Sequence, residues 1–165
     1  MGFPDPRSEG SNNPGATNVL RIAGKKAAFL TLLGDCLKGL IPVLIATVIF
    51  TNPIWIAVTA FSAFLGHCFP IFFSFKGGKG VATAIAATVA FNIYSGVFVI
   101  AIWLLFAKVF KISSLAAIIS FALLPFFIFW QFSNWPLSLI FAVLSSILIW
   151  RHRANIQRLI SGTEA

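Results

Sequence analysis

Two lysines and three glycines stand together in the segment Lys76-Gly77-Gly78-Lys79-Gly80, directly before an apolar run. Glycines let backbone N–H groups approach a ligand closely, and the start of a helix adds the positive end of its dipole. Ammonium groups at the same place favour an anion site. The segment is not a Walker A loop, because its glycine spacing differs and no Ser or Thr follows the lysine. The alternative interpretation is a basic loop with flexible glycines.

A second polar segment, residues 10–21, is rich in Gly, Ser, Asn and Thr and ends at Arg21. Hydroxyl and amide groups beside accessible backbone N–H groups are typical of a loop that binds an anion. The guanidinium of Arg21 can bind a phosphate or a carboxylate through two parallel hydrogen bonds. The alternative is an ordinary turn followed by a helix N-cap.

The third polar segment runs from His152 to Glu164, near the C-terminus. If the preceding helix continues into it, His152 and Asn155 lie on one face, three residues apart. These side chains, with the basic residues around them, suit a polar substrate. The alternative is a basic cytoplasmic tail.

The rest of the 165-residue chain is strongly apolar, with 59% hydrophobic residues, 10% charged residues and a mean hydropathy of +0.95. Because a soluble domain carries about 25% charged residues, this composition excludes a soluble enzyme and a disordered chain. It indicates an integral membrane protein of one domain, residues 1–165. The net charge of +8 would suggest nucleic acid in a soluble protein. In a membrane protein it indicates cytoplasmic loops and an anionic ligand or lipid surface.

Membrane helices are predicted by the apolar runs at 27–50, 54–73, 81–107, 112–130 and 135–150. The 27 residues of 81–107 form either one tilted span or two short helices broken near residues 92–96. With the first 26 residues cytoplasmic, one span leaves six basic loop residues inside and five outside, whereas a hairpin leaves all eleven inside. The positive-inside rule therefore favours the hairpin. Such half-length helices persist when they pack against protein rather than lipid.

The predicted fold is thus an all-α polytopic membrane protein. Its expected elements are a cytoplasmic loop at 1–26, six helices at about 27–50, 54–73, 81–92, 94–107, 112–130 and 135–150, and a cytoplasmic tail at 151–165. In this topology all three polar segments face the cytoplasm, so one active site can include them all.

Three ionisable residues lie inside the predicted helices. Asp35 and Lys38 are three residues apart, and we expect a structural ion pair, because each charge alone would be costly in lipid; a direct substrate contact is the alternative. His67 is expected to be structural rather than catalytic. Cys36 and Cys68 are interpreted as small buried hydrophobic residues.

The order and spacing of the three polar segments resemble the motifs of one family, the bacterial membrane acyl-phosphate:glycerol-3-phosphate acyltransferases (the PlsY family). The family motif GSGNPGATN is similar to GSNNPGATN at residues 10–18. The motif KGGKG followed by V/A-A-T is similar to residues 76–83, and HRxNIxRLxxGxE is similar to residues 152–164. The resemblance covers nearly the whole chain.

Two features depart from the family pattern. Asn12 stands where the family usually has glycine, and it adds a side chain within the phosphate loop, although Asn tolerates a positive φ better than most residues. The family form also has one more membrane helix before the first motif, seven in all, whereas only nine residues precede Gly10 here. We therefore expect either a start site assigned too late or a truncated gene.

The resemblance implies that a fatty acyl group passes from acyl phosphate to the sn-1 hydroxyl of glycerol 3-phosphate. The products are lysophosphatidic acid and phosphate, in the first acylation step of phospholipid synthesis. The implied location is the bacterial inner membrane, with a multi-pass chain and a cytoplasmic catalytic face. Acyl phosphate, glycerol 3-phosphate and membrane lipids are the expected partners; no cofactor, metal, nucleic acid or obligate protein partner is expected.

Site residues follow from the same resemblance. The catalytic residues, which hold glycerol 3-phosphate, are Ser11, Arg21, Lys79, His152 and Asn155. The substrate-binding residues, in the glycine-rich stretches that hold acyl phosphate and its developing oxyanion, are Asn13, Gly15, Thr17, Asn18, Lys76, Gly77, Gly78 and Gly80. Acyl phosphate is already activated, so no covalent intermediate is required, and its own phosphate is expected to take the hydroxyl proton.

A second acyltransferase class uses a His followed, five positions later, by an Asp. Here Phe72 follows His67 at that distance and Gln157 follows His152, so acyl-CoA is not the expected donor.

The rival interpretations are a small anion (phosphate) transporter and an inactive, truncated acyltransferase. Broken helices whose N-termini face an anion also occur in transporters. Transporter sites lie near the membrane midplane, often between repeats. Here the polar segments share one face and no repeat is visible, which favours chemistry at the membrane surface.

Overall fold

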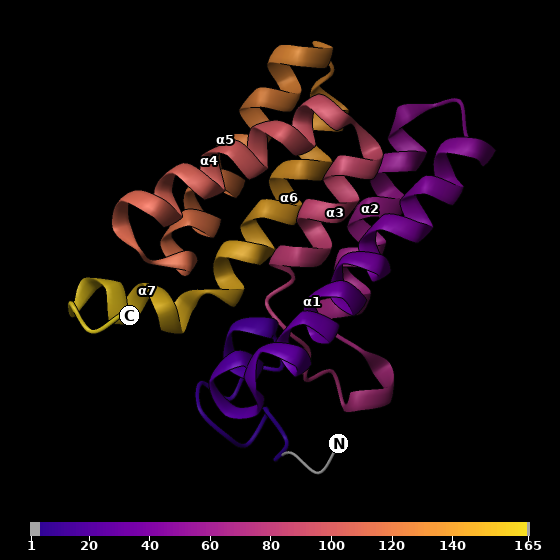
Figure 1. Cartoon of the computed structure of the whole chain (residues 1–165). Helices are drawn as coiled ribbons and strands as arrows, with labels where there is room; N and C mark the ends of the chain where they lie inside the picture. Colours follow the sequence, from indigo (N-terminus) through magenta and orange to yellow (C-terminus); the bar gives the residue numbers. More distant parts are fainter. Residues whose placement is uncertain (1–3, 165) are drawn as a thin grey trace.

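The structure, a computed structural model, describes residues 4–164, and in that range all regular structure is helical. The elements are α1 (Ala16–Ile49), α2 (Pro53–Cys68), the short 3₁₀ helix η1 (Ile71–Phe73), α3 (Val81–Phe91), α4 (Ile93–Phe110), α5 (Ser113–Phe132), α6 (Trp135–Arg151) and α7 (Arg153–Ile160). They form one bundle, and α7 extends from the end of α6 to the left in Figure 1.

Among the described residues, four stretches are long and apolar enough to cross a membrane, namely α1, α2 together with η1, α4 and α5. The pair α6 and α7, bent by 60°, is a fifth candidate. Helix α4 has 18 residues, whereas a half-length helix at 94–107 was expected. Helix α3, with 11 residues, is a shorter apolar helix of about 16 Å, roughly half the thickness of the hydrocarbon core.

Helix α1 begins at Ala16, well before the start expected at residue 27. The apolar run marks where lipid contact begins, but the Ala, Leu, Arg and Lys residues before it are good helix formers and extend the helix. At Gly24 the backbone adopts φ 78°, a left-handed value that glycine takes readily, and the helix kinks there. The turns before Gly24 carry Arg21 at the end of the bundle.

The segment 81–107 contains two helices, α3 and α4, which turn back on each other at Asn92 (Figure 1). A Cβ atom on Gly96 would lie 2.6 Å from the Cα of Val89, whereas one straight helix would separate these residues by about 10 Å. The Asn92 side chain accepts hydrogen bonds from the Ser95 N–H, at 3.0 Å, and from Nε2 of Gln131 in α5, at 3.0 Å. These bonds satisfy the polar groups at the break.

Helix α3 is enclosed by protein, since it packs against α1, α2 and α4. Small side chains make this close packing possible, and all of its buried residues are Ala or Thr. Thr83 donates its hydroxyl to the backbone carbonyl of Asp35 in α1, at 2.9 Å. The loop that precedes α3 is therefore positioned by the neighbouring helices.

The closest approach of α1 to α3 is at Gly39, and it generates a stability prediction. A Cβ atom there would lie 3.0 Å from the carbonyl carbon of Thr83 and 3.1 Å from the N of Ala87, so the two backbones would have to separate. We expect Gly39→Ala to lower the free energy of unfolding by about 1–3 kcal/mol. Gly34→Ala in the same helix is the matched control, because nothing lies within 4 Å of its added Cβ. Equal unfolding midpoints for the two variants in detergent would contradict this packing.

Candidate active site

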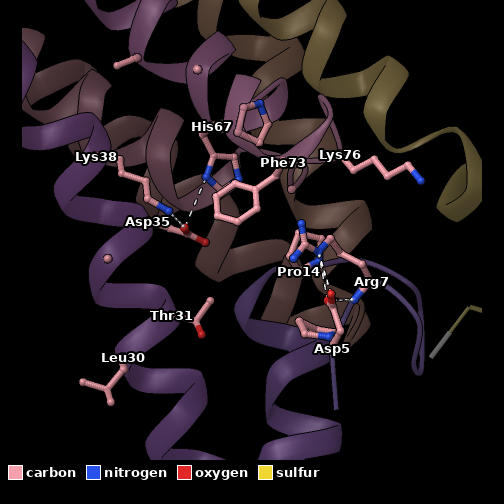
Figure 2. Close-up of a pocket in the computed structure, with 17 residues that line it drawn as sticks. Asp5, Arg7, Pro14, Leu30, Thr31, Asp35, Lys38, His67, Phe73 and Lys76 are labelled. Carbon is pink, nitrogen blue, oxygen red and sulfur yellow. Dashed lines mark hydrogen bonds and ion pairs between the residues drawn. The ribbon is translucent and has the colours of Figure 1, made fainter. Parts of the chain in front are cut away.

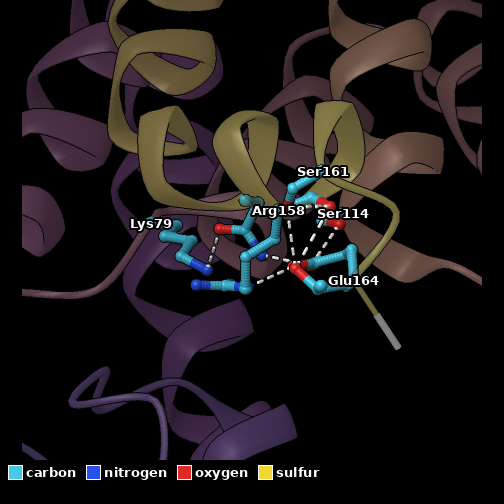
Figure 3. A network of polar contacts seen from close by, with 7 residues as sticks. Lys79, Ser114, Arg158, Ser161 and Glu164 are labelled. Carbon is cyan, nitrogen blue, oxygen red and sulfur yellow. Dashed lines mark hydrogen bonds and ion pairs between the residues drawn. The ribbon is translucent and has the colours of Figure 1, made fainter.

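Lys79 connects the glycine-rich loop before α3 to the C-terminal helix α7. Its Nζ donates a hydrogen bond of 2.5 Å to Oδ1 of Asn155, across 76 positions of sequence (Figure 3). Asn155 is 5% exposed, so the contact lies inside the protein. The second and third polar segments therefore meet directly.

The charges around Lys79 are mostly positive. Its pKa is lowered from 10.5 to about 8, chiefly by burial. The carboxylate of Glu164 opposes this shift, while the cationic groups of Arg158, Arg151 and Arg21 contribute to it. Arg21, in the first polar segment, is thus close enough to Lys79 for its charge to act on that ammonium. Such a cluster of cationic groups favours the binding of an anion.

Glu164 is the acceptor at the centre of the network in Figure 3. It accepts from Oγ of Ser114 at 2.7 Å, from Nδ2 of Asn155 at 2.5 Å and from Nε of Arg158 at 2.6 Å. Burial acts to raise the pKa of this carboxyl, but the three hydrogen bonds outweigh it and hold the pKa below its usual value. The network ties the C-terminal segment to α5 and α7 and orients the amide of Asn155.

His152 lies at the bend between α6 and α7, so the helix does not run on through the third segment. The expected shared face of one continuous helix is therefore absent, yet His152 and Asn155 are both buried. Nδ1 of His152 lies 2.8 Å from the carbonyl oxygen of Leu148. Since a carbonyl only accepts, Nδ1 carries the proton, and Nε2 is left as the acceptor of the neutral ring.

The first polar segment is held by the buried side chain of Asn18. Its Oδ1 accepts from the N–H of Ser11 at 2.9 Å, and its Nδ2 donates to the carbonyls of Pro6 and Glu9 at 3.0 and 2.9 Å. Asn18 was expected to bind substrate, and that role stays a prediction; in the structure its side chain holds the preceding loop. These contacts hold Ser11 against Asn18, which lies about one helical turn before Arg21 in α1.

The loop itself turns through left-handed conformations. Gly10 has φ 61° and Asn12 has φ 54°, a region that Asn enters more readily than most residues. Asn13 and Gly15 are half-buried and close to each other, since a Cβ on Gly15 would lie 2.8 Å from Nδ2 of Asn13. Thr17 is exposed in the first turn of α1.

The glycines of the second segment are required by close packing. A Cβ on Gly77 would lie 2.6 Å from the carbonyl oxygen of Cys68, and one on Gly78 would lie 3.0 Å from Cε1 of His67. Gly80 has φ 82°, which favours glycine. Lys76, in contrast, is exposed at the start of the loop.

Arg151, at the end of α6, contacts this loop and was not among the expected site residues. Its NH2 group donates to the carbonyl of Gly77 at 2.6 Å, and its Nε donates to that of Gly78 at 3.2 Å. The guanidinium also lies over the ring of Phe69, 5.4 Å from its centroid. In the sequence Arg151 is a basic residue directly after an apolar run. The positive-inside rule already explains such a residue, so it did not indicate a site. Glu164 was visible in the third motif without an assigned role, and Ser114 had no signal.

A cavity of about 560 Å³ borders the same loop (Figure 2). Lys76, Gly77 and Gly78 line it, together with apolar side chains of Leu30, Ala63 and Phe73. Lys79 and Arg151 are not part of its lining, so the glycine-rich loop lies between the cavity and the Lys79 network. Within residues 4–164, no group of three or more His, Cys, Asp or Glu side chains could hold a metal ion.

Asp35 lies in the wall of this cavity. Its Oδ1 accepts from Nζ of Lys38 at 3.0 Å, which is the expected ion pair, and lies 3.4 Å from Nδ1 of His67. His67 thus connects the acid to Gly78, against which its ring packs.

The fold and the side chains around Lys79 define a polytopic membrane protein with a cationic, partly buried cluster at one end of a helix bundle. A family model described as glycerol-3-phosphate acyltransferase matches residues 1–162, and the chain belongs to this family.

Similar proteins agree over nearly the whole chain. The glycerol-3-phosphate acyltransferases of Thioalkalivibrio sulfidiphilus and Methylococcus capsulatus are 48% and 47% identical to it, over 99% and 100% of this chain and 80% and 83% of theirs. A crystal structure of PlsY (YgiH), an integral membrane glycerol 3-phosphate acyltransferase, in its glycerol 3-phosphate form, has a TM-score of 0.92 and 39% identity, covering 98% of this chain and 82% of that one. The lysophosphatidic acid form has a TM-score of 0.84 and 38% identity, covering 94% and 80%. The predicted family and the predicted all-α polytopic membrane fold are confirmed.

The Glu164 network generates a second stability prediction. In Glu164→Gln, Arg158 loses its ion-pair partner. The NH2 group of the new amide would also face groups that donate to Glu164. We expect the free energy of unfolding in detergent to fall by about 1–3 kcal/mol. Glu9→Gln is the matched control, because Glu9 is exposed. If both variants unfold at the same midpoint, the network does not stabilise the docking of α7.

Proposed function

We propose that this chain transfers a fatty acyl group from acyl phosphate to the sn-1 hydroxyl of glycerol 3-phosphate, giving lysophosphatidic acid and phosphate. The reaction takes place at the cytoplasmic face of the bacterial inner membrane. The observation that carries the proposal is the Lys79–Asn155 contact, which joins two polar segments among three arginines. Family membership supports the same activity.

Glycerol 3-phosphate binds in the Lys79 network. Its phosphate is a dianion near neutral pH, and it requires the ammonium of Lys79 and the guanidinium of Arg21. Asn155 and the Nε2 acceptor of His152 are suited to the hydroxyl groups of the glycerol. Ser11, which is exposed and whose backbone N–H donates to the amide oxygen of Asn18, is assigned to the same substrate.

Acyl phosphate binds on the cavity side of the glycine-rich loop. The cavity combines apolar side chains, which suit the start of an acyl chain, with Lys76 and the backbone of Gly77 and Gly78, which suit its phosphate. Its volume lies in the range of small-molecule sites. Backbone N–H groups beside the carbonyl stabilise the negative charge that develops on its oxygen.

The chemical step needs little from the protein beyond position and charge. The glycerol oxygen attacks the acyl carbonyl carbon, a tetrahedral oxyanion forms, and the bond from that carbon to the phosphate oxygen then breaks. The departing phosphate takes the hydroxyl proton, so atoms and charge balance without an enzyme base. Two anionic substrates repel each other, and the cationic site offsets this repulsion.

The test uses membrane vesicles of known orientation that contain the full chain. Labelled glycerol 3-phosphate is supplied with palmitoyl phosphate or, separately, with palmitoyl-CoA. We expect lysophosphatidic acid from palmitoyl phosphate only, in inside-out but not right-side-out vesicles, and its loss in Lys79→Ala. Lys108→Ala, which removes an exposed charge at the end of α4, is the matched control and should remain active. Phosphate flux without lysophosphatidic acid would support a transporter instead. Lysophosphatidic acid formed from palmitoyl-CoA would refute acyl phosphate as the specific donor.

The lowered pKa of Lys79 predicts how substrate binding depends on pH. Below about pH 8 the ammonium is protonated and attracts phosphate; above it the free protein loses that charge. Since the substrate becomes a dianion above about pH 6, the KM for glycerol 3-phosphate should be lowest between about 6 and 8 and rise beyond. Lys79→Arg keeps its charge at all these pH values. Its alkaline rise in KM should disappear, and an unchanged rise would exclude Lys79 as its cause.

A further inference from the structure

Arg151 binds the backbone of the glycine-rich loop rather than a side chain. It is in the last turn of α6, and its two hydrogen bonds, of 2.6 and 3.2 Å, end on the consecutive carbonyls of Gly77 and Gly78. Both glycines are buried, so water does not replace these bonds. One guanidinium therefore fixes the orientation of two successive peptide planes.

Each fixed carbonyl also fixes an N–H group. In a trans peptide the N–H points opposite to the carbonyl, so the N–H groups of Gly78 and Lys79 point away from Arg151. Among residues 4–164, neither of these N–H groups has a hydrogen-bond acceptor. Gly77 and Gly78 line the cavity and Arg151 does not, so the N–H edge of the loop faces the cavity side. Two adjacent unpaired donors there form a site for an oxyanion.

We propose that Arg151 is a positioning residue, which holds the loop so that the Gly78 and Lys79 N–H groups bind the acyl phosphate and its developing oxyanion. This inference rests on the proposed function. The planar fork of arginine suits the task, since it binds two carbonyls at once while stacking on the ring of Phe69. A lysine at this position would supply one point charge without the fork.

Arg151 has a second, separable effect. Its positive charge is one of those that lower the pKa of Lys79. Removing the charge therefore raises that pKa and moves the alkaline limb of the glycerol 3-phosphate profile to higher pH. Replacing the planar guanidinium by another cationic group leaves the alkaline limb at the same pH.

The experiment compares Arg151→Gln, which removes the charge and the fork, with Arg151→Lys, which removes only the fork. Arg153→Gln is the matched control, because Arg153 is exposed two residues further on, lies over Trp150 at 4.6 Å and makes no contact with the loop. For each variant in vesicles, KM and kcat are measured separately for palmitoyl phosphate and glycerol 3-phosphate between pH 6 and about 10. Folding is checked by unfolding midpoint in detergent.

We expect Arg151→Gln to lose about 100-fold in kcat/KM for palmitoyl phosphate, the cost of misplacing a reacting group by about 1 Å. Its KM for glycerol 3-phosphate at pH 7 should change little, and its alkaline limb should move upward. Arg151→Lys should show a smaller loss of kcat/KM for palmitoyl phosphate, and the alkaline limb of its glycerol 3-phosphate profile should stay at the same pH. If Arg151→Gln does not fold, the Arg151→Lys result decides. Unchanged palmitoyl phosphate kinetics in the folded variants, or equal losses for both substrates, would overturn the inference.

Failure of the proposed function can be told apart from failure of this inference. If the wild-type chain forms no lysophosphatidic acid, the proposed function is refuted, and with it the role of the loop in binding acyl phosphate. Hydrogen exchange of residues 77–79 then decides the structural part. Faster exchange in Arg151→Lys than in Arg153→Gln supports the clamp on the loop, and equal exchange refutes it.

Discussion

The structure depends on holding several positive charges close together at one end of the helix bundle. Lys79 lies among Arg21, Arg151 and Arg158, and its pKa of about 8 reflects both the burial of its ammonium and this repulsion. The carboxylate of Glu164 partly offsets the repulsion. An anion placed among these groups offsets the remaining repulsion, so the charge cluster favours the binding of phosphate. Helix ends from α1, α3, α6 and α7 converge there because a helix end carries polar backbone groups as well as side chains.

A second constraint concerns backbone groups near a membrane. Irregular backbone at that depth persists only where protein or a water-filled cavity surrounds it. The glycine-rich loop meets this condition from three sides. Arg151 binds its carbonyls, His67 and the end of α2 pack against its glycines, and α3 continues from it between α1, α2 and α4. The short length of α3 follows from this arrangement, since its start is set by the loop and its end by the break at Asn92.

The membrane helices and the polar segments could be predicted from the sequence. A membrane permits few arrangements for a chain of this composition and charge distribution. The break near Asn92 followed from counting basic loop residues, and the three polar segments were recognisable by residue type. The contacts between distant segments were not predictable. Arg151 looked like a basic residue that ends a span, and nothing local indicates that its guanidinium reaches Gly77. Asn18 likewise resembled a substrate-binding residue, whereas its side-chain amide forms hydrogen bonds to the preceding loop. Helix α1 starts early because helix propensity continues beyond the apolar run.

The thin partition between cavity and polar network gives these contacts a common purpose. A transfer between two anions requires both to be neutralised by separate groups, yet the reacting carbon and oxygen must come within about 3.5 Å. A wall of ordinary side chains would hold the two sites too far apart. Glycines have no side chains and keep this separation small: Gly77 and Gly78 line the cavity, and the next residue, Lys79, reaches Asn155 in the polar network. A loop of consecutive glycines has little stiffness of its own and needs support from its neighbours. Arg151 in α6 and His67 in α2 supply that support.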